Sequence, residues 1–224
     1  MGLLLLVPTV LAACVFWDIQ YTALLTLATV VAALVPFFLY FEKGNLRPRD
    51  IMPVVVLSAL AVAGRMMFQP FPSFMPVSAI VILAGASFGR QSGFLTGALS
   101  AAVSNMFLGQ GPWTPWQMYA WGVIGYLAGT LAAHGVFRRG WTVYVFGLLS
   151  AILYGWILDS WYIIGFIHPL TWGNALLAYL AGFPFTMSHA IATVVFLIPI
   201  YKPWSKKLSR IKRKYGMMMP EKGR

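Results

Sequence analysis

The sequence predicts an all-α polytopic membrane protein, and three observations support this fold class. Of the 224 residues, 60% are hydrophobic and only 9% are charged, which is too apolar for a water-soluble core with a polar exterior. The apolar residues gather in stretches close to the roughly 20 residues that a membrane-spanning helix needs. The basic residues fall in alternate loops between these stretches, as in multi-pass proteins whose basic loops face the cytoplasm.

Taken in order along the chain, the apolar stretches and the prolines, glycines and charges between them predict eight helices. The expected ranges are 2–17, 20–41, 51–68, 74–89, 92–108, 115–135, 141–164 and 174–200. The fourth and fifth helices are joined only by Arg90-Gln91-Ser92, so they should form a tight antiparallel pair. Pairs of small residues predict close helix contacts, since helices in lipid approach one another through such residues. These pairs are Ala59 with Ala63, Gly93 with Gly97, and Gly125 with Gly129.

The charge distribution predicts the orientation in the membrane. Basic residues occur in the loop at 42–50, at Arg90, at Arg138 and Arg139, and in the tail, whereas the loops at 66–73, 109–114 and 165–173 are uncharged. If all eight helices span, both termini are cytoplasmic. Nine of the sixteen Lys and Arg residues lie between Lys202 and Arg224. This cluster explains much of the net charge of +11 and predicts a cytoplasmic anchor on anionic lipid, not a nucleic-acid-binding site.

Several function classes find no support in the sequence. It contains no phosphate-binding loop and no metal-ligand spacing, so we expect no bound cofactor or metal and no ATPase activity of its own. The single cysteine, Cys14, excludes an intramolecular disulfide. Residues 11–14 match a lipoprotein cleavage site, but residues 1–10 lack the basic residue of a signal peptide, which favours coincidence over lipidation.

The uncharged outer loops are rich in aromatic and amide side chains, which suit a concave site for a neutral, partly aromatic ligand. An ordinary aromatic belt at the membrane interface is the alternative for any single tryptophan. The candidate substrate-binding residues in these loops are Gln69, Gln110, Trp113, Trp116, Gln117, Trp161, Tyr162, His168, Trp172 and Asn174.

Three polar residues within the apolar helices extend this candidate site. Arg65, Asn105 and Asp159 all lie near the outer ends of their helices, and such groups usually face the protein interior or a wet cavity. Arg65 and Asp159 could contact a ligand or form an ion pair. A serine-protease interpretation of Gly85-Ala86-Ser87-Phe88-Gly89 with His189 as base is disfavoured by depth. His189 lies roughly 17 Å from the inner end of its helix, whereas Ser87 lies close to the inner surface.

Residues 49–117 resemble the substrate-binding S-components of energy-coupling factor (ECF) vitamin transporters. The resemblance rests on Ala59-xxx-Ala63, on residues 85–89, on Gly93-xxx-Gly97 and above all on Gly109-Gln110-Gly111-Pro112-Trp113-Thr114-Pro115-Trp116-Gln117-Met118. This last, tryptophan-rich motif looks like that of a cobalamin-type subgroup. The resemblance therefore implies cobalamin as transported substrate, with riboflavin, pantothenate or a pyrimidine-type vitamin as alternatives.

The resemblance also implies an architecture and partners. It implies a six-helix core, here at 46–201. The sequence departs from the family pattern at 1–45, which would add two hydrophobic helices, and a basic tail follows at 202–224. The core would bind its vitamin among the three outer loops and topple against a transmembrane scaffold subunit driven by two ATPase subunits. Ala59 and Ala63 would contact that scaffold, and the setting would be a prokaryotic plasma membrane.

Overall fold

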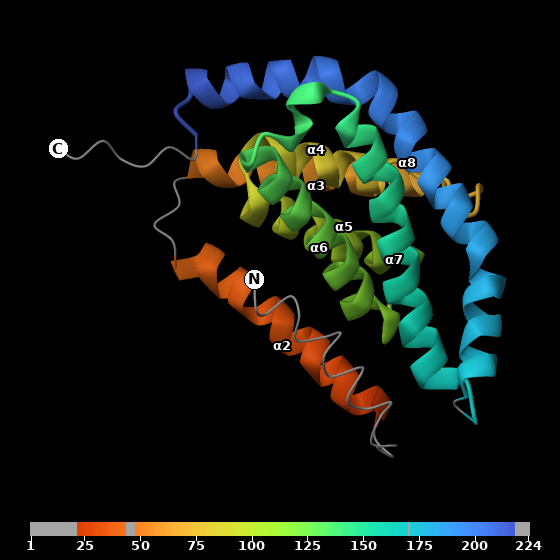
Figure 1. Ribbon diagram of the computed structural model, residues 1–224. Coiled ribbons are helices and arrows are strands. Elements are labelled where there is room, and N and C mark those ends of the chain that lie inside the picture. The colour runs from red at the N-terminus through yellow and green to blue at the C-terminus, as the bar shows by residue number, and fades with distance from the viewer. Residues whose placement is uncertain (1–21, 44–47, 170, 218–224) are drawn as a thin grey trace.

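The computed structural model describes residues 22–43, 48–169 and 171–217 of the chain. In this part of the chain all regular structure is helical, which confirms the predicted all-α fold (Figure 1). The predicted helix at 2–17 lies outside the described residues. The elements are α2 (Thr22–Lys43), α3 (Pro48–Met67), α4 (Val77–Phe88), α5 (Arg90–Leu108), α6 (Trp113–Ala133), the 3-10 turn η1 (Val136–Arg139), α7 (Thr142–Phe166) and α8 (Trp172–Lys214).

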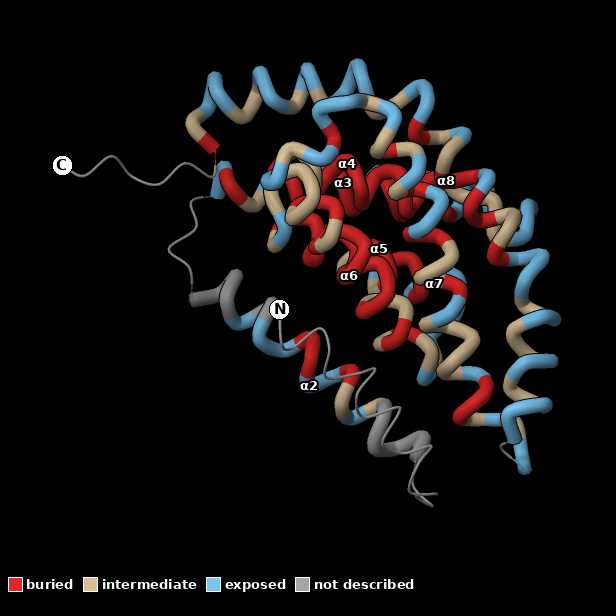
Figure 2. Tube along the Cα trace, viewed as in Figure 1, coloured by how far each residue is buried: buried red, intermediate tan, exposed pale blue. Residues whose placement is uncertain are grey.

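Length and composition qualify three of the described helices to cross a membrane, namely α3, α7 and α8. Helix α4 has only 12 residues. It is therefore about 18 Å long, compared with a hydrocarbon core of about 30 Å. Almost all of its side chains are buried, and Figure 2 shows that buried residues concentrate in α4, α5 and α6. A helix enclosed by its neighbours can be short, because it meets protein instead of lipid on every side.

Helices α5 and α6 pack with their backbones in contact, as the glycine spacing predicts. A Cβ atom added to Gly125 would overlap the carbonyl oxygen of Gly93, and one added to Gly97 would overlap the carbonyl oxygen of Trp121. Gly85 brings α4 against the same stretch of α6, since its added Cβ would meet the carbonyl of Gly125. These small residues let α4, α5 and α6 form one tightly packed unit.

Helix α2, one of the two extra N-terminal helices, packs along this unit. Val30, Ala33 and Leu34 are buried and form an apolar cluster with residues of α5 and α6. Partly buried residues of α7, including Leu153 and Ile157, pack against the same cluster. Helix α2 therefore covers a face formed by α5, α6 and α7.

The prediction that the last helix ends near residue 200 is wrong, because α8 continues to Lys214. Figure 1 shows that it curves along its length, so that its C-terminal part crosses the end of the bundle. Three prolines at 184, 199 and 203 lie inside it, and prolines are a common cause of helix bending. Beyond residue 200, apolar side chains including Leu208 and Ile211 pack on the core and stabilise the extra turns.

Candidate functional site

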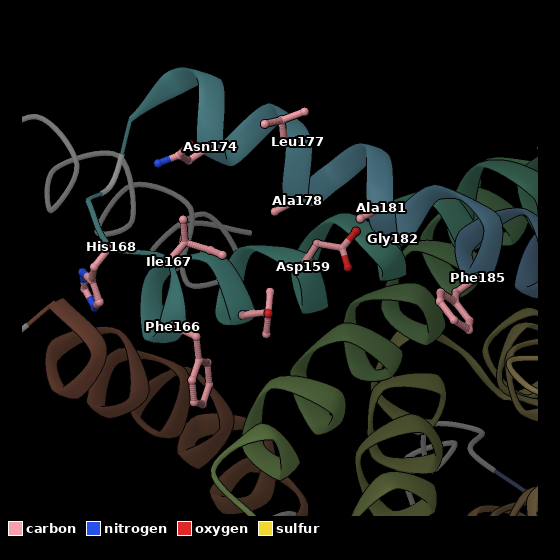
Figure 3. Close-up of a pocket in the computed structure, with 11 residues that line it drawn as sticks. Asp159, Phe166, Ile167, His168, Asn174, Leu177, Ala178, Ala181, Gly182 and Phe185 are labelled. Carbon is pink, nitrogen blue, oxygen red and sulfur yellow. The ribbon is translucent and has the colours of Figure 1, made fainter.

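A pocket of about 630 Å³ lies between α7 and α8, next to the loop that joins them (Figure 3). Four of the predicted binding residues line it: Asp159, Tyr162, His168 and Asn174. Its remaining lining is largely apolar, with the two aromatic side chains of Phe166 and Phe185 and with aliphatic and small residues of α8. Apolar walls with a few polar groups are typical of small-molecule sites.

A second cavity of about 240 Å³ adjoins the pocket on its inner side. Asp159, Gly182 and Phe185 line both spaces, so Asp159 lies at their junction. Gly182 faces this carboxylate directly, since a Cβ atom at that position would lie 2.7 Å from Asp159 Oδ2. In the sequence, Asp159 is the only acidic residue between positions 51 and 200. The combined space therefore has one acidic group where its two parts meet.

The inner cavity is lined by Tyr154 and His189, which the sequence analysis did not include in the site. Their rings stack with centroids 4.8 Å apart, and His189 Nε2 lies 2.7 Å from Ser78 Oγ. Trp121 donates from its indole nitrogen to the same serine at 3.0 Å. The sequence gives little indication that these two residues line a cavity, because an isolated polar residue in an apolar helix can face either lipid or the protein interior.

This arrangement also bears on the protease hypothesis. The hydrogen-bond partner of His189 is Ser78, at the beginning of α4, whereas Ser87 lies at the far end of the same helix. Along the helix axis the two serines are about 13 Å apart. A nucleophile and its base must come within about 3 Å, so Ser87 and His189 do not form a catalytic pair.

Arg65 does not pair with Asp159, contrary to one of the two predicted alternatives. It is buried on α3 and donates to Ser104 and, at 2.7 Å, to Asn105 Oδ1 on α5. Its guanidinium also lies over the ring of Trp121, 5.1 Å from the ring centroid. These contacts arise because α3 packs against α4 and α5, whereas α7 carries Asp159 toward α8.

A hydrogen-bonded chain continues from Asn105 into the tryptophan-rich segment. Asn105 Nδ2 donates to Thr114 Oγ1 at 2.9 Å and to Gln117 Oε1 at 2.8 Å. Thr114 in turn donates to Gln110 Oε1 at 2.9 Å. The structure therefore brings Arg65, Asn105, Gln110 and Gln117 together, with Thr114 as a member that the sequence analysis missed. Its position between two tryptophans was the available signal.

The four predicted tryptophans and Gln69 divide into three groups. Trp113 and Trp161 meet edge to face with centroids 6.1 Å apart, and Trp161 contacts Phe166, which lines the pocket. Trp116 is only 1% exposed and belongs to the cluster covered by α2. Gln69 and Trp172 are exposed and lie outside the pocket lining. The structure thus joins the first pair to the pocket and separates the others from it.

In comparisons with known proteins, the chain matches one family model. The model of the family described as ECF-type riboflavin transporter, S component, matches residues 45–206, which is more than two thirds of the chain. The matched region begins after α2 and ends within α8. Neither the curated proteins nor the solved structures give a significant match.

Proposed function

Because the chain belongs to the S-component family of ECF-type riboflavin transporters, it is a substrate-binding membrane subunit of a vitamin transporter, and we propose that its substrate is cobalamin. In this proposal the chain binds substrate for transport and catalyses no reaction. The partners would be a transmembrane scaffold subunit and two ATPase subunits. We further propose a prokaryotic plasma membrane as its location, with the basic loops and both termini in the cytoplasm.

The pocket between α7 and α8 is the observation that supports a role in binding a vitamin. Its volume of about 630 Å³, with the adjoining inner cavity of about 240 Å³, is within the range for small-molecule sites, about 300–1,000 Å³, and would hold the corrin ring of cobalamin but not the whole molecule. The corrin ring of cobalamin is large, flat and bordered by neutral carboxamides. Aromatic walls would contact such a ring, while Asp159 and Asn174 would hydrogen-bond its amide groups.

Riboflavin is the second candidate substrate, and the family match favours it directly. Its flat ring system and hydroxylated chain would also suit aromatic walls with a few polar groups. It is much smaller than cobalamin and would fit wholly within the pocket. The tryptophan-rich segment at 109–118, which resembles the cobalamin-type subgroup, is the feature that favours the larger substrate.

Calorimetry on the purified chain in detergent tests the substrate directly. Cobalamin, riboflavin and pantothenate would each be titrated into separate samples. We expect saturable binding of cobalamin and no heat of binding with the other two. Selective riboflavin binding would replace the proposed substrate and leave the transport role in place. Binding of none would contradict both substrate assignments.

The carboxylate of Asp159 should contribute measurably to this binding. Replacing it by asparagine keeps the shape of the side chain but removes the charge that strengthens a hydrogen bond from the ligand. We expect Asp159→Asn to weaken binding about fivefold, since a hydrogen bond to a charged group is worth about 1 kcal/mol more than a neutral one. Calorimetric dissociation constants of the variant and the parent chain would give this ratio.

The matched control is Leu176→Ala, which removes an exposed side chain of α8 that does not line the pocket. It should bind the substrate as the parent chain does. If Asp159→Asn also binds with unchanged affinity, Asp159 does not contact the ligand and the pocket assignment is wrong at this position.

Docking on the scaffold is assigned to α3. Ala59 and Ala63 are both exposed and lie one turn apart on the same face of the helix. The neighbouring exposed residues Met52, Val55 and Val56 extend this apolar face. Small residues at its centre would let a partner helix approach closely, which supports the assignment.

A further inference from the structure

Helix α2 lies outside the part of the chain that matches the family, because the matched residues begin at 45. Figure 1 shows it running along one side of the bundle. Three of its residues, with the i, i+3, i+4 spacing of a single helix face, are buried: Val30, Ala33 and Leu34. The residues beside them are exposed: Val31, Ala32 and Val35. One face of α2 is therefore packed on the protein, and the other is available to contact lipid.

The buried face of α2 packs on the tryptophan-rich segment. Its apolar cluster contains Trp116, which is 1% exposed, and Tyr119, which lies about one turn further along α6. Ala33 is completely buried in this cluster, and such a small residue lets two helices approach closely. Helix α2 thus fixes Trp116 in the first turns of α6, and Trp113 lies one turn before it at the start of the same helix.

The same cluster reaches α7 behind the substrate pocket. Ile157 and Trp161 are one turn apart on one face of α7, and both pack against the cluster. Asp159 and Tyr162 belong to the other side of the helix and line the pocket. Leu158 lies between these faces, since it packs against the cluster and also lines the inner cavity. Helix α7 therefore forms a wall with the α2-covered cluster on one side and the two cavities on the other.

A chain of aromatic contacts joins α6, α7 and the pocket. Trp113 of α6 meets Trp161 of α7 edge to face, with ring centroids 6.1 Å apart. Trp161 in turn contacts Phe166, which lines the pocket, with ring centroids 5.5 Å apart. Because α2 packs on the helices at both ends of the Trp113–Trp161 contact, a shift of α2 would disturb this contact and the pocket wall together.

We propose that α2 is a positioning element of the substrate site, which holds the Trp113–Trp161 pair and the α7 wall in the geometry that binds the vitamin. The inference rests on the proposed function, in that it takes the pocket between α7 and α8 as the substrate site. Side chains that are already ordered need not be ordered by the ligand, so preorganisation increases affinity. Docking should not depend on α2, because it packs on α5, α6 and α7, whereas the docking face is on α3.

Two neighbouring alanines of α2 provide a matched pair of variants. Ala33→Phe places a ring in the buried contact and should push α2 away from the cluster, whereas Ala32→Phe places the same ring on the exposed side. Uptake of cobalamin, and in parallel of riboflavin, by cells that express the complete transporter gives a half-saturating concentration and a maximal rate. We expect Ala33→Phe to raise the half-saturating concentration roughly tenfold, because the ligand would have to order two tryptophan side chains. The maximal rate should stay unchanged, and Ala32→Phe should behave as the parent chain does.

Hydrogen exchange on the purified chains, without any vitamin, separates a local effect from a general loss of stability. In Ala33→Phe we expect faster exchange of the backbone amides in the segment 109–118 and in the outer half of α7. Exchange in α4, which is buried at the centre of the bundle, should be unchanged. A merely structural role of α2 would instead accelerate exchange in all three regions.

Equal half-saturating concentrations in Ala33→Phe and Ala32→Phe would overturn the proposal, and so would faster exchange throughout the bundle. If Ala33→Phe no longer co-purifies with the scaffold but keeps its calorimetric affinity, α2 is a docking element and the positioning role is wrong. If the parent chain takes up neither cobalamin nor riboflavin, the proposed substrates are wrong. Hydrogen exchange then decides the role of α2, and unchanged exchange in the segment 109–118 and in α7 would exclude it.

A second pair of variants applies the same test by a milder change. Should Ala33→Phe fail to fold, the buried pair Val30→Ala and Leu34→Ala would be compared with the exposed pair Val31→Ala and Val35→Ala. Both double variants shorten two aliphatic side chains of α2. Only the buried pair should raise the half-saturating concentration, and equal values for the two would overturn the proposal.

Discussion

The variant Ala59→Trp should transport less than about a tenth of the vitamin that the parent chain transports, with an unchanged dissociation constant for the substrate. Ala59 is exposed on α3, one turn from Ala63, and the substrate pocket lies between α7 and α8. A tryptophan on this face would hold a partner helix away from the close approach that small residues allow. It would not reach the pocket. The variant should therefore lose docking on the scaffold and keep its affinity for the substrate.

Uptake by cells that express the complete transporter, together with calorimetry on the isolated chain, measures the two effects. The matched control is Leu149→Trp, which places the same ring on an exposed position of α7. This control should transport normally if lipid, and not the scaffold, covers that side of α7. If Ala59→Trp transports normally, or if it loses substrate binding while still co-purifying with the scaffold, the docking assignment to α3 is wrong.

The sequence predicted helix positions well because lipid imposes a simple requirement on them. Each apolar stretch must satisfy its backbone hydrogen bonds internally. Its length, and the prolines, glycines and charged residues at its ends, therefore identify a helix. The predicted range 92–108, for example, agrees with α5 at Arg90–Leu108 to within two residues at its first end. The end of α8 was missed because its final turns are stabilised by Leu208 and Ile211 against the core, and their partners lie far away in sequence.

The site was harder to predict, because sequence gives the depth of a residue in the membrane but not the direction in which it points. Arg65 and Asp159 lie near the outer ends of their helices and have opposite charges, which made an ion pair a reasonable expectation. Helix α3, which carries Arg65, instead packs against α4 and α5, whereas Asp159 on α7 faces α8. Arg65 therefore donates to Ser104 and Asn105 of α5. Trp113 and Trp116 show the same limit, since they share one motif while only Trp116 is buried in the cluster that α2 covers.

Gly125→Leu should strongly destabilise the helix bundle. Gly125 lies where α6 crosses α5, and even a Cβ atom would overlap the carbonyl oxygen of Gly93. Backbone atoms cannot rotate away as a side chain does, so the two helices would have to separate. Overpacking in well-packed cores costs about 1–3 kcal/mol and sometimes more, and we expect the upper end of this range. The separation would also loosen α4, because Gly85 contacts the carbonyl of Gly125 on α6.

Thermal melting of the purified chain in detergent measures this loss, and a decrease in melting temperature of roughly 10 °C is expected for about 3 kcal/mol in a chain of this size. The control is Gly165→Leu near the end of α7, where an added Cβ atom meets nothing within 4 Å. It makes the same chemical change and should melt close to the parent temperature. If the two variants melt together, helices α5 and α6 do not depend on backbone contact at Gly93 and Gly125, and the tightly packed unit of α4, α5 and α6 must be stabilised by its apolar side chains alone.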